Sequence, residues 1–508
     1  MTNNPTAPLF YTDAYKLDHR RQYPEGTTGV YSNYTNRGSR IPEIDHVVHF
    51  GLQAFLQKFM MDAFVPFFEA DEDEVAEEYT RKVTAILGPN EVGNDHIRAL
   101  HRKGYLPLRF CAVPEGTLVP LRVPSFTIEN TDDDFFWLVN YIETIVSASV
   151  WQASTSATLA YHFRQILDNG AKLTSSTPEA VAFQGHDFSF RGLSSLETAQ
   201  ASGAGHLLSF SGTDTLTALD WINQYYAGEN GFVGGSVPAT EHSVMCAGGQ
   251  EDEEYTFKRL LKLYPTGILA IVSDTWSFFD AINRGGILDR LREDILFRDG
   301  KLVIRPDSGD PADIICGTQR TRHAEGIDGA WDTDEEKGAI QLLWERFGGT
   351  VNDKGFRELD PHIGLIYGDS ITSERARDII ERLAEKGYAS TNVVFGVGSF
   401  TYQYNTRDTF GSAMKATWVK FEDGTEKNIQ KNPKTDNGLK KSATGRLAVM
   451  TKRATGELYL VQEAEPWQEE NSRLQPVWEN GEFLKYQSFA DVRNSLKVSS
   501  SVVNKVEV

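Results

Sequence analysis

The sequence predicts an α/β protein in which a β/α-barrel-like domain, residues 176–399, is combined with a discontinuous α+β domain made of residues 1–175 and 400–508. Three observations support this prediction. Short β-prone apolar runs recur in the middle of the chain, each run stops at a polar residue or a glycine, and helix-forming segments fill the intervals. Both chain ends lack this rhythm, so we assign them together to the second domain.

The barrel-like domain is expected to contain six or seven strand units. Successive runs lie roughly 30 residues apart, which is the length of one strand with its return helix. The expected strands are residues 180–183, 207–210, 233–237, 267–272, 302–304, 363–366 and 393–395, and the residues that end the units are Asp187, Asp214, His242, Asp274, Asp307, Asp369 and Gly398. The interval before Asp369 is about twice as long as the others. It indicates an insertion, for which the polar segment 317–336 is the candidate.

Strands that alternate with helices favour a parallel sheet, and the carboxyl ends of parallel strands share one edge. Polar residues cluster at the ends of these expected strands. The pattern therefore predicts a site at the carboxyl rim of a closed barrel. An open, doubly wound sheet gives similar local patterns and is the structural alternative.

Helices are predicted from apolar periodicity and end signals. Apolar residues at three- and four-residue spacing predict an amphipathic helix within residues 45–68, and residues 134–168 have the periodicity of a long helix. Ser194 and Glu197 have the spacing of a capping box, and a helix at Ser373–Lys386 is expected to end at Gly387. The acidic segment 69–78 is expected to face solvent.

Three features are expected near the C-terminus. Residues 457–461 read as a strand and Asn480–Gly481 as a turn. Residues 498–508 read as a frayed tail.

Composition excludes several classes of protein. Lys and Arg number 51 and Asp and Glu 71, so the net charge of −20 repels nucleic acid and acidic membrane surfaces. An anionic substrate therefore requires a local basic pocket. The three cysteines are too few and too scattered for a disulfide framework or a thiolate metal cage, and no apolar run approaches the roughly 18 residues of a membrane-spanning helix. We expect a soluble protein of the reducing cytoplasm.

Phosphate binding is indicated by two segments. The sequence contains no Walker loop, dinucleotide fingerprint, zincin motif or serine-hydrolase elbow. Residues Gly396–Ser399 directly follow an expected strand, so their backbone N–H groups suit either a phosphate at a helix start or a simple tight turn. The region 400–446 is locally basic, which suits an anionic ligand or a solvated loop. Its basic residues are Arg407, Lys415, Lys431, Lys440 and Lys441.

Other strand ends carry acid–base groups. Arg305 and Asp307 flank a proline, and the pair suits a phosphate together with a sugar hydroxyl or metal, or else a structural ion pair. Gly368–Asp369 suits a ribose contact or a helix cap. His242, beside Glu241, is either a structural histidine or a residue that transfers protons or accepts phosphate.

In combination, the segments resemble the nicotinamide phosphoribosyltransferase family over nearly the whole chain. The segments that carry the resemblance are Thr12–Lys16 with His19 and Gln22–Pro24, Gly185–Gly192, Gly212–Thr215, Ser236–Ser243, Ile304–Gly309, Gly368–Asp369 and Thr406–Asp408. The resemblance implies a type II phosphoribosyltransferase fold and a cytosolic homodimer that uses Mg²⁺, with active sites at the subunit interface. It implies that nicotinamide and 5-phosphoribosyl 1-diphosphate give nicotinamide mononucleotide and diphosphate in NAD salvage.

The resemblance also assigns roles to residues of this chain. Phe188 and Tyr15 of the partner subunit would enclose the nicotinamide ring, and Asp214 would accept a hydrogen bond from its carboxamide, which favours nicotinamide over nicotinate. His242 would be phosphorylated by ATP as co-substrate. Asp274 is expected to orient the ring of His242, which is inferred from its position at a strand end and not from a motif. The remaining assignments are Arg191 and Arg305 around the ring and diphosphate, Asp307, Gly368 and Asp369 near the ribose and metal, Gly398, Ser399, Arg407 and Lys415 at the 5′-phosphate, and Asp13, Arg37, Lys431 and Lys440 at the diphosphate. No protein ligand set for Mg²⁺ is assigned, because the substrate diphosphate is expected to hold it.

The sequence departs from the family at the phosphate loop, which reads Gly-Val-Gly-Ser where a version richer in glycine is usual, and before Lys415, which follows Ser-Ala-Met. Two other functions remain as alternatives. A nicotinate phosphoribosyltransferase shares the barrel and the phosphate groups, and a metal-dependent β/α-barrel lyase shares the carboxylates at strand ends.

Overall fold

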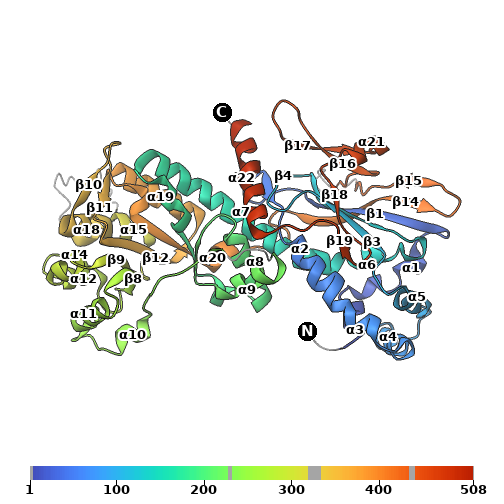
Figure 1. The fold of residues 1–508 in the computed structure, drawn as a ribbon, viewed down its shortest axis with the longest axis horizontal. Helices are drawn as coiled ribbons and strands as arrows, with labels where there is room; N and C mark the ends of the chain where they lie inside the picture. The colour runs from blue at the N-terminus through green and yellow to red at the C-terminus, as the bar shows by residue number, and fades with distance from the viewer. Residues whose placement is uncertain (1–3, 227–230, 319–332, 434–440, 507–508) are drawn as a thin grey trace. The chain divides into compact units, whose positions relative to one another are not determined.

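The structure, a computed structural model, describes residues 4–226, 231–318, 333–433 and 441–506. The chain divides into two compact units (Figure 1). Unit 1 comprises Met1–Thr158, Asp220–Asn230 and Asn405–Val508, and unit 2 comprises Leu159–Leu219 and Gly231–Tyr404. Domain boundaries at residues 176 and 399 stay a prediction from the sequence.

Unit 2 is built on a six-stranded sheet whose neighbouring strands are all parallel, in the order β7-β6-β13-β12-β9-β8. Its strands are β6 (Gly185–Asp187), β7 (Gly212–Thr213), β8 (Thr266–Val272), β9 (Asp299–Arg305), β12 (Ile363–Ile371) and β13 (Val393–Val397). Isolated parallel bridges join Gly212 to Gly235 and Ala239 to Ala270, so the segment 235–239 connects the two outer strands. The strands therefore form a ring, and the β/α-barrel-like prediction is confirmed over the open-sheet alternative.

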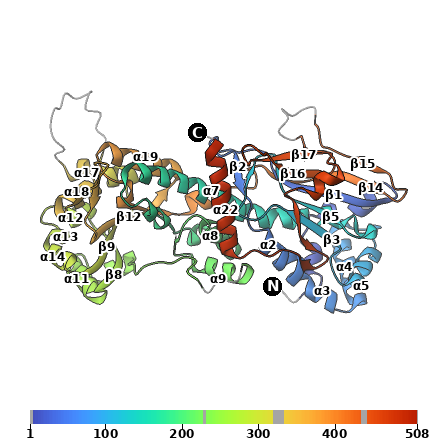
Figure 2. The same ribbon diagram turned by 45° about the horizontal axis from the view of Figure 1, so that its top comes forward.

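Helices surround the ring of strands, as the labels around β8, β9 and β12 show in Figures 1 and 2. Helix α19 illustrates why they form: Thr372 caps its N-terminus by accepting from Arg375 N, one face is buried, and the chain leaves at Gly387 with φ of 74°. The helices within unit 2 are α8 (Leu196–His206), α10 (His242–Cys246), α11 (Glu253–Leu263), α12 (Phe278–Ile282), α13 (Ile287–Arg290), α14 (Arg292–Leu296), α15 (Pro311–Cys316), α17 (Asp334–Lys337), α18 (Ala339–Phe347), α19 (Ser373–Glu385) and α20 (Ser399–Tyr402), and a small hairpin is formed by β10 (Gly349–Val351) and β11 (Arg357–Leu359). The expected insertion at 317–336 falls mostly on residues 319–332, outside the described residues.

Three of the expected strands are wrong. Residues 180–183 belong to a 3-10 helix, Pro178–Phe183, in which Val181 is buried and Phe183 is 54% exposed. Residues 207–210 form a turn after α8, and their apolar side chains pack into the core rather than onto a sheet. The strands that follow them, β6 and β7, are short and made of Gly, His, Asp and Thr, so apolar periodicity does not reveal them. Residues 233–237 occupy the position of a strand but make only a single bridge, at Gly235. The strands expected within β8, β9, β12 and β13 are confirmed.

Unit 1 is built on a seven-stranded antiparallel sheet in the order β15-β14-β1-β5-β3-β18-β19. The tight turn Asn480–Gly481, with φ of 52° and 91°, joins β18 to β19 as the sequence predicts. The strands of unit 1 are β1 (Thr27–Asn36), β2 (His46–Val48), β3 (Leu108–Ala112), β4 (Leu118–Pro120), β5 (Pro124–Asn130), β14 (Ser412–Phe421), β15 (Glu426–Asn428), β16 (Leu447–Thr451), β17 (Leu458–Gln462), β18 (Gln475–Glu479) and β19 (Glu482–Phe483). The strand expected at 457–461 is β17.

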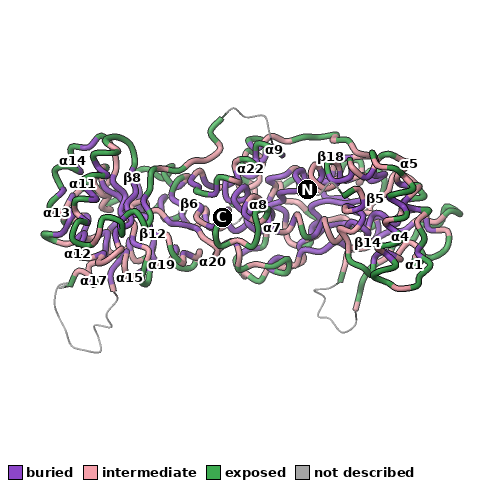
Figure 3. Tube along the Cα trace, turned by 90° about the horizontal axis from the view of Figure 1, so that it is seen from below, coloured by how far each residue is buried: buried purple, intermediate pink, exposed green. Residues whose placement is uncertain are grey.

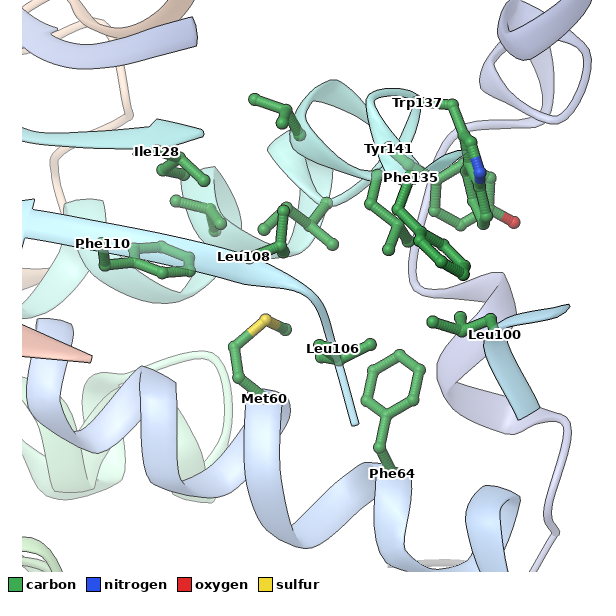
Figure 4. Packing of buried hydrophobic residues seen from close by; sticks show 14 of the residues in the cluster. Met60, Phe64, Leu100, Leu106, Leu108, Phe110, Ile128, Phe135, Trp137 and Tyr141 are labelled. Atoms are coloured by element: carbon green, nitrogen blue, oxygen red, sulfur yellow. The ribbon is translucent and has the colours of Figure 1, made fainter. Parts of the chain in front are cut away.

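A large apolar core fills the space between this sheet and the helices of unit 1. Met60 and Phe64 point from the helical segment toward Leu106, Leu108 and Phe110 (Figure 4). Buried stretches likewise follow the strands of unit 1 in Figure 3. The helices of unit 1 are α1 (His19–Gln22), α2 (Leu52–Phe55), α3 (Val65–Glu69), α4 (Glu72–Leu87), α5 (Asp95–Lys103), α6 (Leu138–Tyr141), α21 (Pro466–Glu470) and α22 (Phe489–Val506), while α7 (Glu143–Thr174) and α9 (Leu216–Tyr225) contribute to both units.

Three expected boundaries need correction. The helix expected at 45–68 begins at Leu52, because residues 46–48 pair with β4 as strand β2, and it contains a π-helical turn at Leu56–Met61. The N-cap of α8 is Ser195, whose side chain accepts from Thr198 N, and not Ser194. The expected frayed tail continues helix α22, which buries Val492 and Leu496. Among the described residues, no helix is both long and apolar enough to cross a membrane.

Candidate active site

Asp214 follows strand β7, and its carboxylate is held by two side chains. The Nε2 atom of His186, on β6, lies 3.0 Å from Asp214 Oδ1, and Ser236 Oγ donates to the same oxygen. Burial would raise the pKa of Asp214, but the hydrogen bonds and the charge of Arg305 lower it below its ordinary value. Asp214 is therefore ionised at neutral pH. Both bonds fall on Oδ1, so within the described residues Oδ2 is open as an acceptor.

Phe188 lies near Asp214 and His186, and its ring has contacts on several sides. Its ring packs on a small buried cluster inside the ring of strands, and the Arg305 guanidinium carbon lies 5.9 Å from its centroid. A Cβ atom at Gly396 would lie 2.4 Å from the ring, and one at Gly368 would lie 3.4 Å from it. Glycine at 396 therefore lets the β13 backbone approach the aromatic ring. The site presents a fixed aromatic face, which suits a flat ligand.

His242 stands at the start of α10 beside two carboxylates. Its Nε2 atom lies 3.9 Å from Asp274 Oδ1 and 3.8 Å from Asp307 Oδ2, and its Nδ1 atom lies 3.3 Å from Thr275 Oγ1. The ring is half exposed, whereas only 4% of the Asp274 side chain is exposed. Asp274 is held in turn, since Oδ2 accepts from Asp307 N at 3.0 Å and from Ser308 Oγ at 2.7 Å. The arrangement orients the histidine ring.

Asp307 and its neighbours form an acidic cluster. Burial raises the pKa of Asp307, and the charges of Asp274 and Asp369 add to this effect, outweighing Arg305 and His242. Tyr367, buried beneath the cluster, also has a raised pKa because of burial and the same three carboxylates. The cluster therefore favours an added cation. In the part of the chain that the structure describes, no three His, Cys, Asp or Glu side chains are arranged to hold a metal ion by themselves.

The end of β12 is irregular where Asp369 leaves it. The register against β13 shifts between Tyr367 and Ile371, and Ser370 adopts a left-handed φ of 55°. Ser370 Oγ donates to Asp369 Oδ2 at 2.7 Å. The irregular backbone exposes Asp369. The strained conformation of Ser370 therefore lies next to a residue for which the sequence predicts substrate contact.

The glycine loop after β13 has an open surface. Gly398 is the N-cap of α20, and a Cβ atom placed on it would meet nothing within 4 Å. Gly192 packs against Ser399, since a Cβ there would lie 2.5 Å from the serine Cβ, and this contact brings exposed Arg191 to the loop. All the site residues predicted in unit 2 thus lie at the same rim, although their roles stay predictions.

The basic residues predicted in unit 1 also converge. A cavity of about 570 Å³ is lined by Arg37 and Lys415, together with Arg122 and Lys441. Lys431 N donates to Oγ of the lining residue Ser442, and Ser442 N donates to the Lys431 carbonyl. The charge of Lys431 acts on Lys415. Such a basic cavity in an acidic protein suits a phosphate-bearing ligand.

Three further predicted residues lie in unit 1, and one lies outside the described residues. Asp13 Oδ2 accepts from Thr144 Oγ1 at 2.6 Å, and Tyr15 is 63% exposed. Arg407 is exposed in the turn whose Gly411 carbonyl accepts from Arg37 Nε at 3.1 Å. Lys440 falls on residues 434–440, which the structure does not describe.

A larger cavity of about 610 Å³ in unit 1 contains none of the predicted site residues. Its inner polar side chains are Gln53, Glu115 and Gln487, and they bind one another and the backbone. Glu115 also accepts from Tyr226 Oη at 2.7 Å. These groups stabilise the fold, so cavity size alone does not identify the site of chemistry.

Several site residues were not assigned from the sequence. His186 and Ser236 lie inside quoted motifs, but their bond to Asp214 depends on the ring joining β6, β7 and segment 235–239. Tyr367 reads as a core residue of a buried strand. Arg122 reads as a surface residue; its left-handed φ of 70°, in the turn before β5, is the local feature that marks it.

Comparisons with protein families place similar sequences over most of the chain. Residues 183–477 match the nicotinate phosphoribosyltransferase (NAPRTase) family, and residues 8–109 match the nicotinamide phosphoribosyltransferase N-terminal domain. A nicotinamide phosphoribosyltransferase of Acinetobacter baylyi is 47% identical over 502 residues, covering 96% of this chain and 97% of that protein. The enzymes of that name from Xanthomonas campestris and Mycoplasma pneumoniae are each 36% identical, over 96% and 86% of this chain and 97% and 94% of their own lengths.

Solved structures resemble the fold at low sequence identity. A nicotinate-nucleotide pyrophosphorylase from Pyrococcus furiosus aligns with a TM-score of 0.59 and 16% identity, covering 99% of this chain and 97% of that one. Human nicotinic acid phosphoribosyltransferase aligns with a TM-score of 0.53 and 15% identity, covering 96% and 93%. At this identity the likeness concerns the fold alone.

Proposed function

Because the chain belongs to the nicotinamide phosphoribosyltransferase family, we propose that it transfers the phosphoribosyl group of 5-phosphoribosyl 1-diphosphate to nicotinamide, a pentosyltransferase reaction. The products are nicotinamide mononucleotide and diphosphate. The observation that carries the choice of base is the ionised carboxylate of Asp214, held by His186 and Ser236 beside Phe188. Its open oxygen accepts a hydrogen bond from a carboxamide NH₂, whereas the carboxylate of nicotinate is repelled.

The chemistry follows from charge. The pyridine nitrogen already carries a lone pair, so its attack on the anomeric carbon requires no general base. Phe188 stacks on the base and Arg305 lies beside it, which positions the nitrogen for attack. Asp307 and Asp369 stabilise the positive charge that develops on the ribosyl carbon, and basic side chains compensate the departing diphosphate.

Mg²⁺ fits the acidic cluster as a cation held mainly by the substrate diphosphate. Asp307 and Asp369 are the residues that would face it. The charge of Asp369 helps to raise the pKa of Asp307, and the charges of both help to raise the pKa of Tyr367. When bound, the ion neutralises the diphosphate leaving group. Asp274 Oδ2 already accepts hydrogen bonds from Ser308 Oγ and Asp307 N, so Asp274 supports the acidic cluster and is not assigned to the ion.

His242 is the residue proposed to receive a phosphoryl group from ATP. Its ring is half exposed, and the nearby carboxylates of Asp274 and Asp307 hold its orientation. A phosphorylated histidine in this position adds negative charge next to the diphosphate site. Formation of the N–P bond releases ADP, and hydrolysis of this bond releases phosphate and restores the free ring, so one ATP is consumed in each coupled cycle.

The basic cavity of unit 1 is proposed to bind phosphate groups of the substrate in a homodimer. Its lining residues Arg37 and Lys415 match the contacts implied for the diphosphate and the 5′-phosphate. Exposed Tyr15 would form the second aromatic face against the base bound by another subunit. We place this dimer in the cytoplasm, in salvage of NAD.

The direct test is incubation with nicotinamide, 5-phosphoribosyl 1-diphosphate and Mg²⁺, with and without ATP, followed by mass detection of the mononucleotide. Parallel reactions with nicotinate measure the choice of base. We expect nicotinamide mononucleotide and diphosphate in equal amounts, and more product with ATP. Product from nicotinate but not from nicotinamide would favour a nicotinate phosphoribosyltransferase. Turnover without diphosphate release would favour the lyase alternative.

A further inference from the structure

The carboxylate of Glu143, the first residue of α7, joins two lysines that are distant in the sequence. Its Oε2 atom lies 2.8 Å from Lys16 Nζ, and its Oε1 atom lies 3.5 Å from Lys415 Nζ. Lys16 belongs to the N-terminal segment and Lys415 to β14. One carboxylate therefore uses both oxygens to hold two cations from different parts of unit 1.

The three side chains differ in exposure in a way that separates their roles. Only 3% of the Lys16 side chain is exposed, against 25% for Glu143 and 34% for Lys415. Lys16 also donates to the Asn140 carbonyl at 2.9 Å, so two of its N–H groups are engaged inside the protein. Lys415 retains access to solvent and lines the basic cavity with Arg37. Lys16 thus anchors Glu143, and Glu143 in turn faces the partly exposed Lys415.

The surroundings of Lys415 require such a partner. Arg37 and Lys431 act on it as like charges, and it donates to the Met414 carbonyl, which fixes one of its three N–H directions. Without a carboxylate, mutual repulsion would move the flexible lysine away from the other cations. The contact with Glu143 fixes a second N–H direction of the Lys415 ammonium. The third N–H group remains as a donor for a ligand.

We propose that Glu143 is a positioning residue for phosphate binding: anchored by Lys16, it holds Lys415 in place to contact a phosphate of 5-phosphoribosyl 1-diphosphate. This inference rests on the proposed function, which places that phosphate in the basic cavity. Glu143 touches no reacting atom in this scheme. Its removal should therefore weaken binding of the phosphorylated substrate and leave the base site unaffected.

The test compares Glu143→Gln, Glu143→Asp and Lys415→Met for both substrates. We expect Glu143→Gln to raise KM for 5-phosphoribosyl 1-diphosphate about tenfold, because misplacement of a contact group by about 1 Å costs this much or more. KM for nicotinamide should stay within about twofold of the wild-type value. The conservative Glu143→Asp variant should recover part of the loss. The double variant Glu143→Gln/Lys415→Met should be no weaker than Lys415→Met alone, since both changes remove one coupled interaction.

Two controls separate positioning from folding. Glu143→Gln leaves buried Lys16 without its carboxylate, so Lys16→Met is combined with it to restore thermal stability while the substrate effect persists. Glu129 is a matched control, because it also bridges two cations of unit 1, Arg109 and Arg446, and it does not line the basic cavity. Glu129→Gln should alter the melting temperature without altering KM for 5-phosphoribosyl 1-diphosphate.

Calorimetric titration of 5-phosphoribosyl 1-diphosphate distinguishes failure of this inference from failure of the proposed function. Wild-type protein that binds this compound but forms no nicotinamide mononucleotide would contradict only the proposed function. The role of Glu143 would then still be tested by the affinity of each Glu143 variant for 5-phosphoribosyl 1-diphosphate. The inference is overturned if Glu143→Gln binds as tightly as wild type while Lys415→Met does not. It is also overturned if the effects of the two changes add in full.

Discussion

The ring of His186 lies 3.0 Å from the carboxylate of Asp214, Nε2 to Oδ1. Because an ionised carboxylate only accepts hydrogen bonds, Nε2 is the donor. The contact holds Asp214 in place from β6, the strand that leads into the Phe188 ring that we propose stacks on the base. In the proposed function, choice of base and stacking of the base therefore depend on one strand end.

Asp214→Asn should reduce kcat/KM for nicotinamide by about 100-fold, because the loss of a charge-assisted hydrogen bond costs roughly 3 kcal/mol. The variant loses the repulsion of a carboxylate substrate, so the ratio of nicotinamide to nicotinate turnover should fall further. Steady-state kinetics with both bases measures this. Asp299→Asn, at an exposed position of β9, is the control and should match wild type.

His186→Gln should shift the low-pH limb of nicotinamide turnover to higher pH. Burial raises the pKa of Asp214 and the His186 hydrogen bond is the largest of the contributions that lower it, so its loss brings the pKa up. A carboxylate with a depressed pKa is ionised above that pKa and loses its charge as the pH falls through it. The kcat/KM profile for nicotinamide from neutral pH to below pH 4 gives the result. An unshifted limb would contradict the idea that nicotinamide turnover depends on an Asp214 carboxylate kept ionised by His186.

His242→Ala should abolish the stimulation by ATP and leave slow basal transfer. The imidazole is the proposed phosphoryl acceptor, whereas attack by nicotinamide uses no group of His242. The measurement is product formation with and without ATP, together with ATP hydrolysis. Retention of the full ATP effect would contradict the assignment.

The sequence predicts the order of the barrel better than its individual strands. Polar residues at roughly 30-residue spacing locate the strand ends, because a parallel barrel repeats one unit length. Strands β6 and β7 are short and polar, and their hydrogen bonds depend on neighbours far along the chain. Local periodicity therefore points to the apolar segments that precede them instead. Contacts such as Glu143 with Lys16 and Lys415 join segments more than a hundred residues apart, and no local pattern encodes them.

Buried His49 should make stability fall as the medium becomes acidic. Burial lowers the pKa of His49 to about 3, against about 6.5 in an unfolded chain, so the unfolded state binds a proton that the folded state excludes between these values. The contribution is fully present above pH 6.5 and is lost as the pH falls toward 3, at about 1.4 kcal/mol per pH unit. His49→Gln should reduce the slope of unfolding free energy against pH by nearly this amount between pH 4 and 6. Urea unfolding at several pH values measures the slope, and an unchanged slope would contradict a neutral buried ring.

Strand β13 approaches the Phe188 ring closely at Gly396. A Cβ atom at Gly396 would lie 2.4 Å from the aromatic ring and 2.7 Å from the Gly368 Cα atom, so the ring or the backbone must move. Gly396→Ala should destabilise the protein by about 1–3 kcal/mol, as overpacked cores do, and should raise KM for nicotinamide by displacing the ring that we propose stacks on the base.

Gly398→Ala is the matched comparison two residues away, where a Cβ meets nothing within 4 Å and φ is −113°. Its unfolding free energy should stay within about 0.5 kcal/mol of wild type. Any kinetic effect of Gly398→Ala should appear in KM for 5-phosphoribosyl 1-diphosphate instead, because its open backbone faces the proposed phosphate. Equal stability of the two variants would show that the contact between Gly396 and Phe188 is not tight in solution.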